Sequence, residues 1–330
     1  MSSKIAKQGI IIGICTRQRN ALLRRLLESI WAQPVPPNYD VEILIVDNND
    51  EPAVTPDVIA LPDKFKLSLL HEPNPGLVNA RNRVLHFATT ANADWLIGID
   101  DDEWVSPDWL AQYIVAFETL DTAIIVAAKH VVYAETMSPF VERRQIKEPP
   151  AGSPTKIFST ANFAISRRVF HPDHGPGMRF EMQFNESGGE DYEFMLRAKN
   201  LHDLTAKYWP YAVATEECTG TRTAFTHHFK RRVAAQAARY QAAALHRKAT
   251  GNQSTVAATL YLLKRTNRAL VYGTGWCLLG VGKVLIGRKN GREVIGKGLF
   301  ALARAYAIIP YLIGARTVLY GAEVNADRSA

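Results

Sequence analysis

The chain contains few cysteines and lacks several widespread catalytic motifs. Its three cysteines, Cys15, Cys218 and Cys277, are far apart among the 330 residues. With no Cys-x-x-Cys pair or Cys/His cluster, the sequence offers no structural zinc site and fits a reducing compartment. It has no GxSxG, HExxH, Walker or GxGxxG motif, which removes the main support for a serine hydrolase, a zinc protease, a P-loop NTPase or an NAD dehydrogenase. The first apolar run, IIIGIC, is short, so we expect a strand there and no signal peptide.

Acidic residues are scarce in the last third of the chain. Residues 221–330 contain 18 Lys and Arg against three Asp and Glu, whereas residues 1–220 contain 21 against 29. A strongly basic segment indicates either nucleic acid or an anionic membrane surface as its partner. Here the basic residues alternate with long apolar stretches and do not form a polar arm. We therefore expect a membrane partner and no nucleic acid.

The front of the chain alternates strand-like apolar runs with helical patterns, and 47% of all residues are hydrophobic, as in a globular protein. The patterns predict strands at 10–15, 41–50, 66–73, 94–104 and 123–133, and helices at 20–33, 76–90 and 188–200. This alternation predicts an α/β, doubly wound, mostly parallel sheet with ligands at the carboxyl ends of its strands. Residues 134–160 predict a surface loop, and the chain after about residue 225 predicts helices.

Three adjacent carboxylates, Asp100, Asp101 and Asp102, follow the apolar run WLIGI. Adjacent carboxylates repel one another unless a positive charge lies between them. At the end of a buried strand, that charge is typically a hard divalent cation that also binds the phosphates of a ligand. Capping of the next helix by Asp102 or Ser106 is the alternative, but it accounts for one carboxylate only. We therefore favour a site for Mg²⁺ or Mn²⁺.

Polar residues also follow the first two predicted strands: Thr16, Arg17 and Arg19 follow the first, and Asp47, Asn48 and Asn49 follow the second. The arginines either bind a diphosphate or a base, or are ordinary solvated side chains. The second group either recognises a base or sugar, or forms an Asx-turn as the chain leaves the strand.

One further candidate residue and two candidate pairs lie outside the strand ends. Arg81, in NPGLVNARNRV, either faces the same sheet edge or is a surface charge. Glu190 and Asp191 follow two glycines at a predicted helix start, where a carboxylate serves either as a general base or as a partner of the helix dipole. His227 and His228 either complete an oxygen-rich metal site or are surface residues on a basic helix.

The ordered set of these segments resembles the family 2 inverting glycosyltransferases with a GT-A fold, of the bacterial exopolysaccharide type. The matching segments are Thr16 to Asn20, the VDNND strand end at Asp47, Asn74 to Val84, Asp100 to Trp104, Thr160 to Arg167 and Gly188 to Phe194. The resemblance covers about residues 8–235. It implies a GT-A-type doubly wound mixed sheet in a catalytic domain, residues 1–235, followed by a C-terminal helical region, residues 236–330.

The resemblance also implies roles for particular residues. Asp47 would bond the base of the donor, Asp100 and Asp102 would bracket the metal and diphosphate, and Asp191 would deprotonate the acceptor hydroxyl. The family often carries an Arg/Gln-rich, tryptophan-containing motif after the Gly188 segment, whereas this chain has TRTAFTHHFKRR, in which Arg222 is the candidate substitute. The residues assigned to the nucleotide-sugar are Thr16, Arg17, Arg19, Asp47, Asn49, Arg81, Asp100, Asp101 and Arg222, and those assigned to the metal are Asp102 with His227 or His228.

The implied activity is metal-dependent, inverting transfer of a sugar from a nucleotide-sugar, expected to be a UDP-sugar, to a lipid-linked or polysaccharide acceptor. A sugar nucleotidyltransferase is one alternative, although the sequence lacks a Gly-rich N-terminal loop followed by lysine. A catalytically silent nucleotide-sugar-binding scaffold is another, although all the carboxylates are present.

Two apolar stretches, 269–287 and 299–320, approach the roughly 20 residues that a membrane span needs. The flanking segments 264–268 and 288–297 are both basic, and the positive-inside rule favours the cytoplasmic side for both. A single crossing would separate them. We therefore predict peripheral or monotopic attachment to the cytoplasmic face of the inner membrane, and not two spans. A helical pair that packs on the catalytic domain or forms a homodimer is the alternative.

Overall fold

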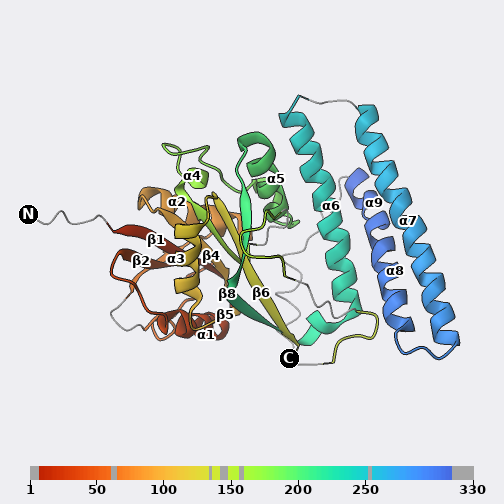
Figure 1. The fold of residues 1–330 in the computed structure, drawn as a ribbon, viewed down its shortest axis with the longest axis horizontal. Coiled ribbons are helices and arrows are strands. Elements are labelled where there is room, and N and C mark those ends of the chain that lie inside the picture. Colours follow the sequence, from red (N-terminus) through yellow and green to blue (C-terminus); the bar gives the residue numbers. More distant parts are fainter. Residues whose placement is uncertain are drawn as a thin grey trace, which may run out of the picture. The chain divides into compact units, whose positions relative to one another are not determined.

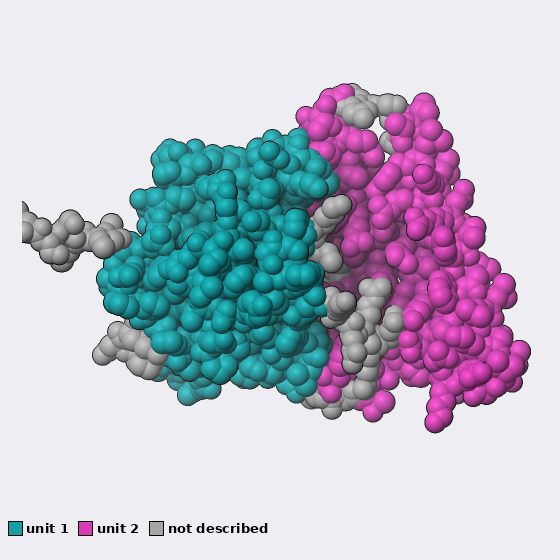
Figure 2. All heavy atoms as spheres, viewed as in Figure 1, with its two compact units in different colours: residues 1–132, 148–185, 194–217 teal, residues 133–147, 186–193, 218–330 magenta. Residues whose placement is uncertain are grey.

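The computed structural model describes residues 7–60, 65–133, 136–141, 148–155, 160–251 and 255–313. The chain forms two compact units, coloured separately in Figure 2. Unit 1 comprises residues 1–132, 148–185 and 194–217, and unit 2 comprises residues 133–147, 186–193 and 218–330. The positions of the units relative to one another are not determined, so each is described by itself (Figure 1). The functional boundary expected after residue 235 lies inside a continuous helix of unit 2 and remains a prediction.

Unit 1 is built on an eight-stranded sheet with the order β3-β2-β1-β4-β7-β6-β8-β5. The strands are β1 (Gln8–Thr16), β2 (Tyr39–Asp47), β3 (Lys66–His71), β4 (Trp95–Asp100), β5 (Glu103–Val105), β6 (Ile124–Tyr133), β7 (Asn162–Ser166) and β8 (Ala206–Cys218). β3, β2, β1 and β4 are parallel. The pairs β4–β7, β6–β7 and β5–β8 are antiparallel. The sheet is therefore mixed, as expected.

Helices cover both faces of this sheet (Figure 1). One face packs against α1 (Asn20–Trp31) and α3 (Trp109–Thr119). The other packs against α2 (Leu77–Thr90), α4 (Arg167–Phe170) and α5 (Glu190–His202). Residues 194–202 of α5 belong to unit 1, and its first turn, residues 190–193, belongs to unit 2. β1 lies between two apolar cores, and successive side chains of a strand point to opposite faces of the sheet. Every position along the middle of β1 therefore has to be apolar, which accounts for its unbroken apolar run. Ile10 and Ile12 belong to the first core, and Ile11 belongs to the second.

The segment expected as one strand, 94–104, is broken at the aspartates. β4 ends at Asp100, a turn contains Asp101 and Asp102, and β5 pairs with β8 instead. The sequence analysis missed β8. Its buried side chains alternate with polar or half-exposed ones, and Pro210 interrupts it, so no apolar run marks it.

Unit 2 contains α6 (Phe225–Ala249), α7 (Thr255–Leu285), α8 (Gly291–Tyr306) and α9 (Ile308–Leu312). α7 and α8 form a hairpin in which glycines face one another. A Cβ on Gly280 would lie 3.0 Å from the carbonyl oxygen of Gly291, and a Cβ on Gly298 would lie 2.7 Å from that of Gly273. Only glycine permits this close backbone approach along the whole hairpin.

The two apolar stretches expected in the tail therefore have different surroundings. Residues 269–285 lie in α7, residues 299–312 lie in α8 and α9, and residues 314–320 fall outside the described residues. By length and composition, Gly291–Leu312 is one helical stretch able to cross a membrane. However, 44% of its most apolar window is buried within the protein.

Candidate functional site

Three predicted site residues meet at one edge of the sheet because the parallel strands end together. β1 ends at Thr16, β2 at Asp47 and β4 at Asp100. The register pairs Thr16 with Asp47, and Cys15 with Asp100. The carboxyl ends of adjacent parallel strands in a doubly wound sheet form its usual ligand crevice. The residues predicted from the sequence therefore share one place in the fold.

Asp101 points into the protein from the turn after β4. Its carboxylate accepts a hydrogen bond from Thr16 Oγ1 at 2.8 Å and one from Arg19 Nη1 at 3.1 Å. Burial raises the pKa of Asp101 to about 6, although the positive charge of Arg19 opposes this. The carboxylate of Asp101 is thus hydrogen-bonded within the protein, and these bonds hold the turn between β4 and β5 in place.

The other two carboxylates of the cluster also have arginine partners. Arg19 Nη1 lies 3.3 Å from Asp102 Oδ2, so one guanidinium bridges Asp101 and Asp102. Arg81 Nη2 lies 3.4 Å from Asp100 Oδ1. Arg81 is a buried residue of α2, so the alternative of a solvated surface charge is wrong. In this structure, arginines supply the positive charge that three adjacent carboxylates need.

Arg25 of α1 is a site residue that the sequence analysis missed. Its Nη2 donates to the backbone carbonyl of Asp102 at 3.1 Å, and its Nη1 lies 3.1 Å from Glu217 Oε2. Its guanidinium also lies 4.4 Å from the ring centroid of Trp104. α1 therefore holds the turn that carries the aspartates. No sequence pattern distinguishes Arg25, because it is one of five polar or charged residues in this helix.

The donor set of the cluster suits a divalent cation bound together with phosphates. Among the described residues, no group of three or more His, Cys, Asp or Glu side chains is placed to hold a metal by itself. Mg²⁺ is usually held by one or two carboxylates plus the phosphates of the substrate, and Mn²⁺ also favours oxygen donors. Asp100 and Asp102 supply such a pair, because the carboxylate of Asp101 is turned inward.

Asp47 is enclosed by the loop that it begins. Its two carboxylate oxygens accept hydrogen bonds from the backbone of Asn49, Ala53 and Val54 and from the side chain of Asn49. Burial raises the pKa of Asp47, but these hydrogen bonds outweigh burial and hold it below its usual value. The contact with Asn49 is the Asx-turn given as the alternative. Base recognition by Asp47 or Asn49 remains a prediction.

A buried ionic cluster lies behind the aspartates, and the sequence analysis also missed it. Glu103 of β5 and Glu216 of β8 are directly opposite each other in the antiparallel register. Lys129 of β6 places its Nζ 2.6 Å from Glu103 Oε1 and 2.7 Å from Glu216 Oε2. Burial raises the pKa of Glu103, and Lys129 opposes this rise. A lysine that ends the apolar run AIIVAA is the one sequence signal that pointed to this cluster.

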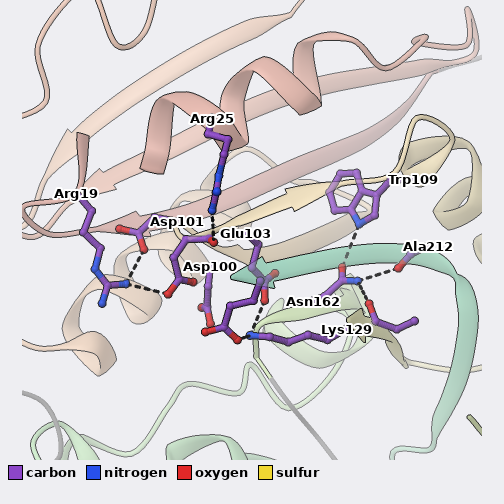
Figure 3. Close-up of polar contacts among 12 residues, drawn as sticks. Arg19, Arg25, Asp100, Asp101, Glu103, Trp109, Lys129, Asn162 and Ala212 are labelled. Carbon is purple, nitrogen blue, oxygen red and sulfur yellow. Dashed lines mark hydrogen bonds and ion pairs between the residues drawn. The ribbon is translucent and has the colours of Figure 1, made fainter. Parts of the chain in front are cut away.

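Asn162 holds the neighbouring strands together within the segment TANF. Its Oδ1 accepts hydrogen bonds from Trp109 Nε1 and Tyr113 Oη. Its Nδ2 donates to the carbonyls of Ala128 and Ala212, and Figure 3 shows the contacts with Trp109 and Ala212. All four bonds are buried. One amide thus joins α3, β6, β7 and β8 beside the end of β4. The segment Thr160 to Arg167, named in the sequence analysis as part of the family resemblance, therefore helps to hold these strands together.

Of the remaining predicted residues, Arg17 of unit 1 places its Nη2 3.0 Å from Oδ1 of the exposed Asp50, and the others belong to unit 2. Asp191 lies in the acidic first turn of α5, where its Oδ1 accepts a hydrogen bond from the backbone of Tyr192. Arg222 lies in a short 3-10 turn, Gly220–Thr223, and His227 and His228 lie in the first turn of α6. Burial, followed by the neighbouring His227, lowers the pKa of His228. Their roles stay predictions, because the structure does not determine where unit 2 lies relative to the aspartates.

The mixed sheet, with arginines and carboxylates gathered where β1 and β4 end, defines an α/β protein whose site suits a phosphate-bearing ligand with a cation. Residues 11–208, more than half of the chain, match the sequence model described as glycosyl transferase family 2. The chain belongs to this family.

Similar proteins agree with this assignment. The succinoglycan biosynthesis protein ExoM of Rhizobium meliloti (strain 1021) is 29% identical over 190 residues, which span 56% of this chain and 59% of that protein. The mannosyltransferase PcManGT of Pyrobaculum calidifontis, solved with GDP-Man and Mn²⁺, has a TM-score of 0.57 and 18% identity, and covers 93% of this chain and 87% of its own. Staphylococcus aureus TarS 1–349, solved with UDP-GlcNAc, has a TM-score of 0.51 and 11% identity, with 91% of each chain covered. These structures confirm the expected GT-A fold.

Proposed function

We propose that this chain transfers a sugar from a nucleotide-sugar donor to an acceptor in bacterial polysaccharide synthesis. The observation that carries the proposal is the cluster of Asp100, Asp101 and Asp102 with Arg19 and Arg81 at the carboxyl ends of β1 and β4. Family membership supports the reaction class. The name of the relative ExoM supports the polysaccharide context.

The donor is a nucleoside diphosphate sugar, with uridine as the expected base. The solved complexes of PcManGT with GDP-Man and of TarS with UDP-GlcNAc support this ligand class. Arg19 and Arg81 are placed to bind the diphosphate, because guanidinium groups donate several hydrogen bonds in a plane. Asp100 and Asp102 would hold Mg²⁺ or Mn²⁺, which offsets the charge that develops on the leaving diphosphate.

Transfer proceeds by a single displacement that inverts the anomeric centre. The acceptor oxygen forms a bond to the anomeric carbon while the bond from that carbon to the diphosphate oxygen breaks. Asp191 takes the proton of the acceptor hydroxyl, and the nucleoside diphosphate leaves with the bonding electrons. The reaction needs no covalent enzyme nucleophile.

The acceptor is a growing glycan, lipid-linked or polysaccharide, at the cytoplasmic face of the membrane. The basic, apolar unit 2 supports this location, since residues 221–330 contain 18 Lys and Arg against three Asp and Glu. An enzyme held at the bilayer meets a lipid-linked acceptor at high local concentration.

The test is release of nucleoside diphosphate from UDP-sugars and GDP-sugars by the full chain, with and without Mn²⁺ or Mg²⁺. Asp191→Asn should reduce transfer by about 10²–10⁴-fold and keep UDP binding, because it removes only the proton acceptor. Asp102→Asn should weaken Mn²⁺-dependent UDP binding. Asp121→Asn is the matched control, because Asp121 is a fully exposed carboxylate away from the site.

Three outcomes would contradict the proposal. UDP binding by Asp102→Asn equal to that of the parent chain would remove the metal role. Loss of transfer in Glu190→Gln but not in Asp191→Asn would move the base to Glu190. Release of pyrophosphate from a nucleoside triphosphate and a sugar phosphate would favour a nucleotidyltransferase.

A further inference from the structure

One exposed face of α7 consists mainly of apolar side chains and carries no charge. We name it the outer stripe. It consists of Val256, Leu260, Leu263, Asn267, Val271, Thr274, Leu278, Val281 and Leu285. The exposed fractions of Leu260, Val271, Leu278 and Leu285 are 61%, 71%, 68% and 80%. The two polar members are uncharged. Contiguous exposed apolar surface of this extent marks an interaction site in a folded protein.

The hairpin with α8 leaves the outer stripe facing away from α8. α7 packs on α8 through Gly273 and Gly280, which are both buried. On a helix of 3.6 residues per turn, these glycines lie on the face opposite Val271 and Leu278. The apolar side chains of α8, in contrast, are largely buried within unit 2. They include Val294, Phe300, Ala301 and Ala303. Of the two apolar helices, α7 is therefore the one with a free apolar face.

The charges around the outer stripe match an anionic surface. α7 contains no Asp or Glu, and it carries Lys264, Arg265 and Arg268 in its first half. Arg288, Lys289 and Arg292 follow its end.

The spacing of the outer stripe distinguishes a flat partner surface from a partner helix that forms a coiled coil. Successive members are three or four residues apart, with a mean of about 3.6, which is the period of a straight helix. A coiled-coil partner requires a repeat of about 3.5 residues, which makes the helices supercoil. A stripe that keeps to one side of a straight helix over about eight turns fits a flat surface, and a lipid bilayer is such a surface.

We propose that the outer stripe of α7 is the membrane-binding surface of this chain, with α7 lying in the plane of an anionic bilayer. The apolar side chains enter the acyl boundary, and the basic residues contact lipid headgroups. α8 supports α7 from the protein side and does not span the membrane. This inference rests on the membrane location in the proposed function and names the surface responsible for it.

The experiment is flotation of the full chain with vesicles of phosphatidylcholine and phosphatidylglycerol. Leu278→Asp should require at least tenfold more lipid for half-maximal binding, because it places a negative charge in the stripe. Val115→Asp is the matched control, because Val115 is an exposed valine on α3 of unit 1. If Leu278→Asp does not fold, as judged by its circular dichroism, Leu278→Ser gives the same test without the charge. High salt should weaken binding only partly, since the apolar contribution is not screened.

A second measurement reports the depth of α7. Fluorescence of a tryptophan placed in the stripe by Leu278→Trp, taken as the difference from the parent chain, should be quenched most by lipids brominated close to the headgroup. Strongest quenching from the bilayer centre would mean a spanning helix and would overturn the proposal. So would equal binding of Leu278→Asp and the parent chain, or a lipid-free dimer that Leu278→Asp dissociates. Transfer to a soluble acceptor by Leu278→Asp reports separately on the proposed activity, so the two failures are distinguishable.

Discussion

The two units of this chain bury their side chains in opposite ways. Unit 1 has a large apolar core on each face of its sheet, and it also buries charged residues in ion pairs. Unit 2 has a small core of Val233, Ala237, Tyr240, Leu262, Ala303 and Ala307. Most of the large apolar side chains that are exposed in the described residues belong to unit 2.

This difference indicates which contacts each unit can complete without a partner. In unit 1, the charges Lys129, Arg19 and Arg81 are placed against carboxylates, so the site is organised before any ligand binds. In unit 2, basic groups and apolar side chains share the surface. Basic groups interact favourably with anionic lipid headgroups, and apolar side chains interact favourably with the acyl region of a bilayer.

Lys129→Met should destabilise unit 1 by about 3–5 kcal/mol, because it leaves two buried carboxylates opposite each other without their cation. Lys66→Met is the matched control: its ion pair with Asp40 is exposed, so the expected cost is about 0–1 kcal/mol. Urea unfolding followed by tryptophan fluorescence measures both. The triple variant Lys129→Met/Glu103→Gln/Glu216→Gln should recover stability. Equal costs at Lys129 and Lys66 would refute the role of the buried cluster.

Asn162→Ala should cost about 3 kcal/mol, because Trp109, Tyr113 and two backbone carbonyls lose their buried partner. Asn79→Ala removes a solvent-exposed hydrogen bond to the Pro75 carbonyl and should cost under about 1 kcal/mol. The same urea series checks both. A cost at Asn162 no larger than at Asn79 would mean that water replaces the lost amide.

Gly298→Val should disturb unit 2 and leave unit 1 intact, at a cost of about 1–3 kcal/mol. A Cβ at Gly298 would lie 2.5 Å from Cys277 Sγ and 2.7 Å from the backbone nitrogen of Cys277. Gly282→Val is the control, because a Cβ there meets no atom within 4 Å. Limited proteolysis should cleave the α7–α8 hairpin faster in Gly298→Val only, while UDP binding stays unchanged. Loss of UDP binding would show that the units do not fold separately.

Asp47→Asn should reduce stability by about 1.5–3 kcal/mol at pH 7, which is typical of hydrogen bonds to a charged group. The pKa of Asp47 is lowered in the folded chain, so its stabilisation is present above the unfolded value of about 3.9 and is lost as the pH falls through the lower folded value. The difference between parent and variant should therefore shrink below about pH 4. Urea titrations at pH 7 and pH 3 measure it. A difference independent of pH would assign the effect to the shape of the loop alone.

The strand ends were predictable from the sequence, and the contacts between distant strands were not. Apolar runs with helical segments between them predicted parallel strands, and so placed Thr16, Asp47 and Asp100 at one edge. Lys129 and Glu216 are 87 positions apart in numbering, and only the pairing of β5 with β8 brings Glu216 opposite Glu103. No local pattern encodes that register. The same holds for Asn162, whose four partners come from three elements.

Local patterns in the sequence predict the kind of sheet, the acidic cluster at its edge and the basic, apolar character of the last third of the chain. These follow from local periodicity, residue type and charge, which act over a few neighbouring positions. Only the tertiary structure decided that Asp101 turns inward to Thr16 and Arg19, that Asp47 is enclosed by its own loop, and that α8 is covered while the outer stripe of α7 is not. α7 and α8 have similar apolar compositions. α8 is the buried one because it also packs against α6, as in the stacking of Phe300 on Phe225, and such contacts exist only in the folded chain.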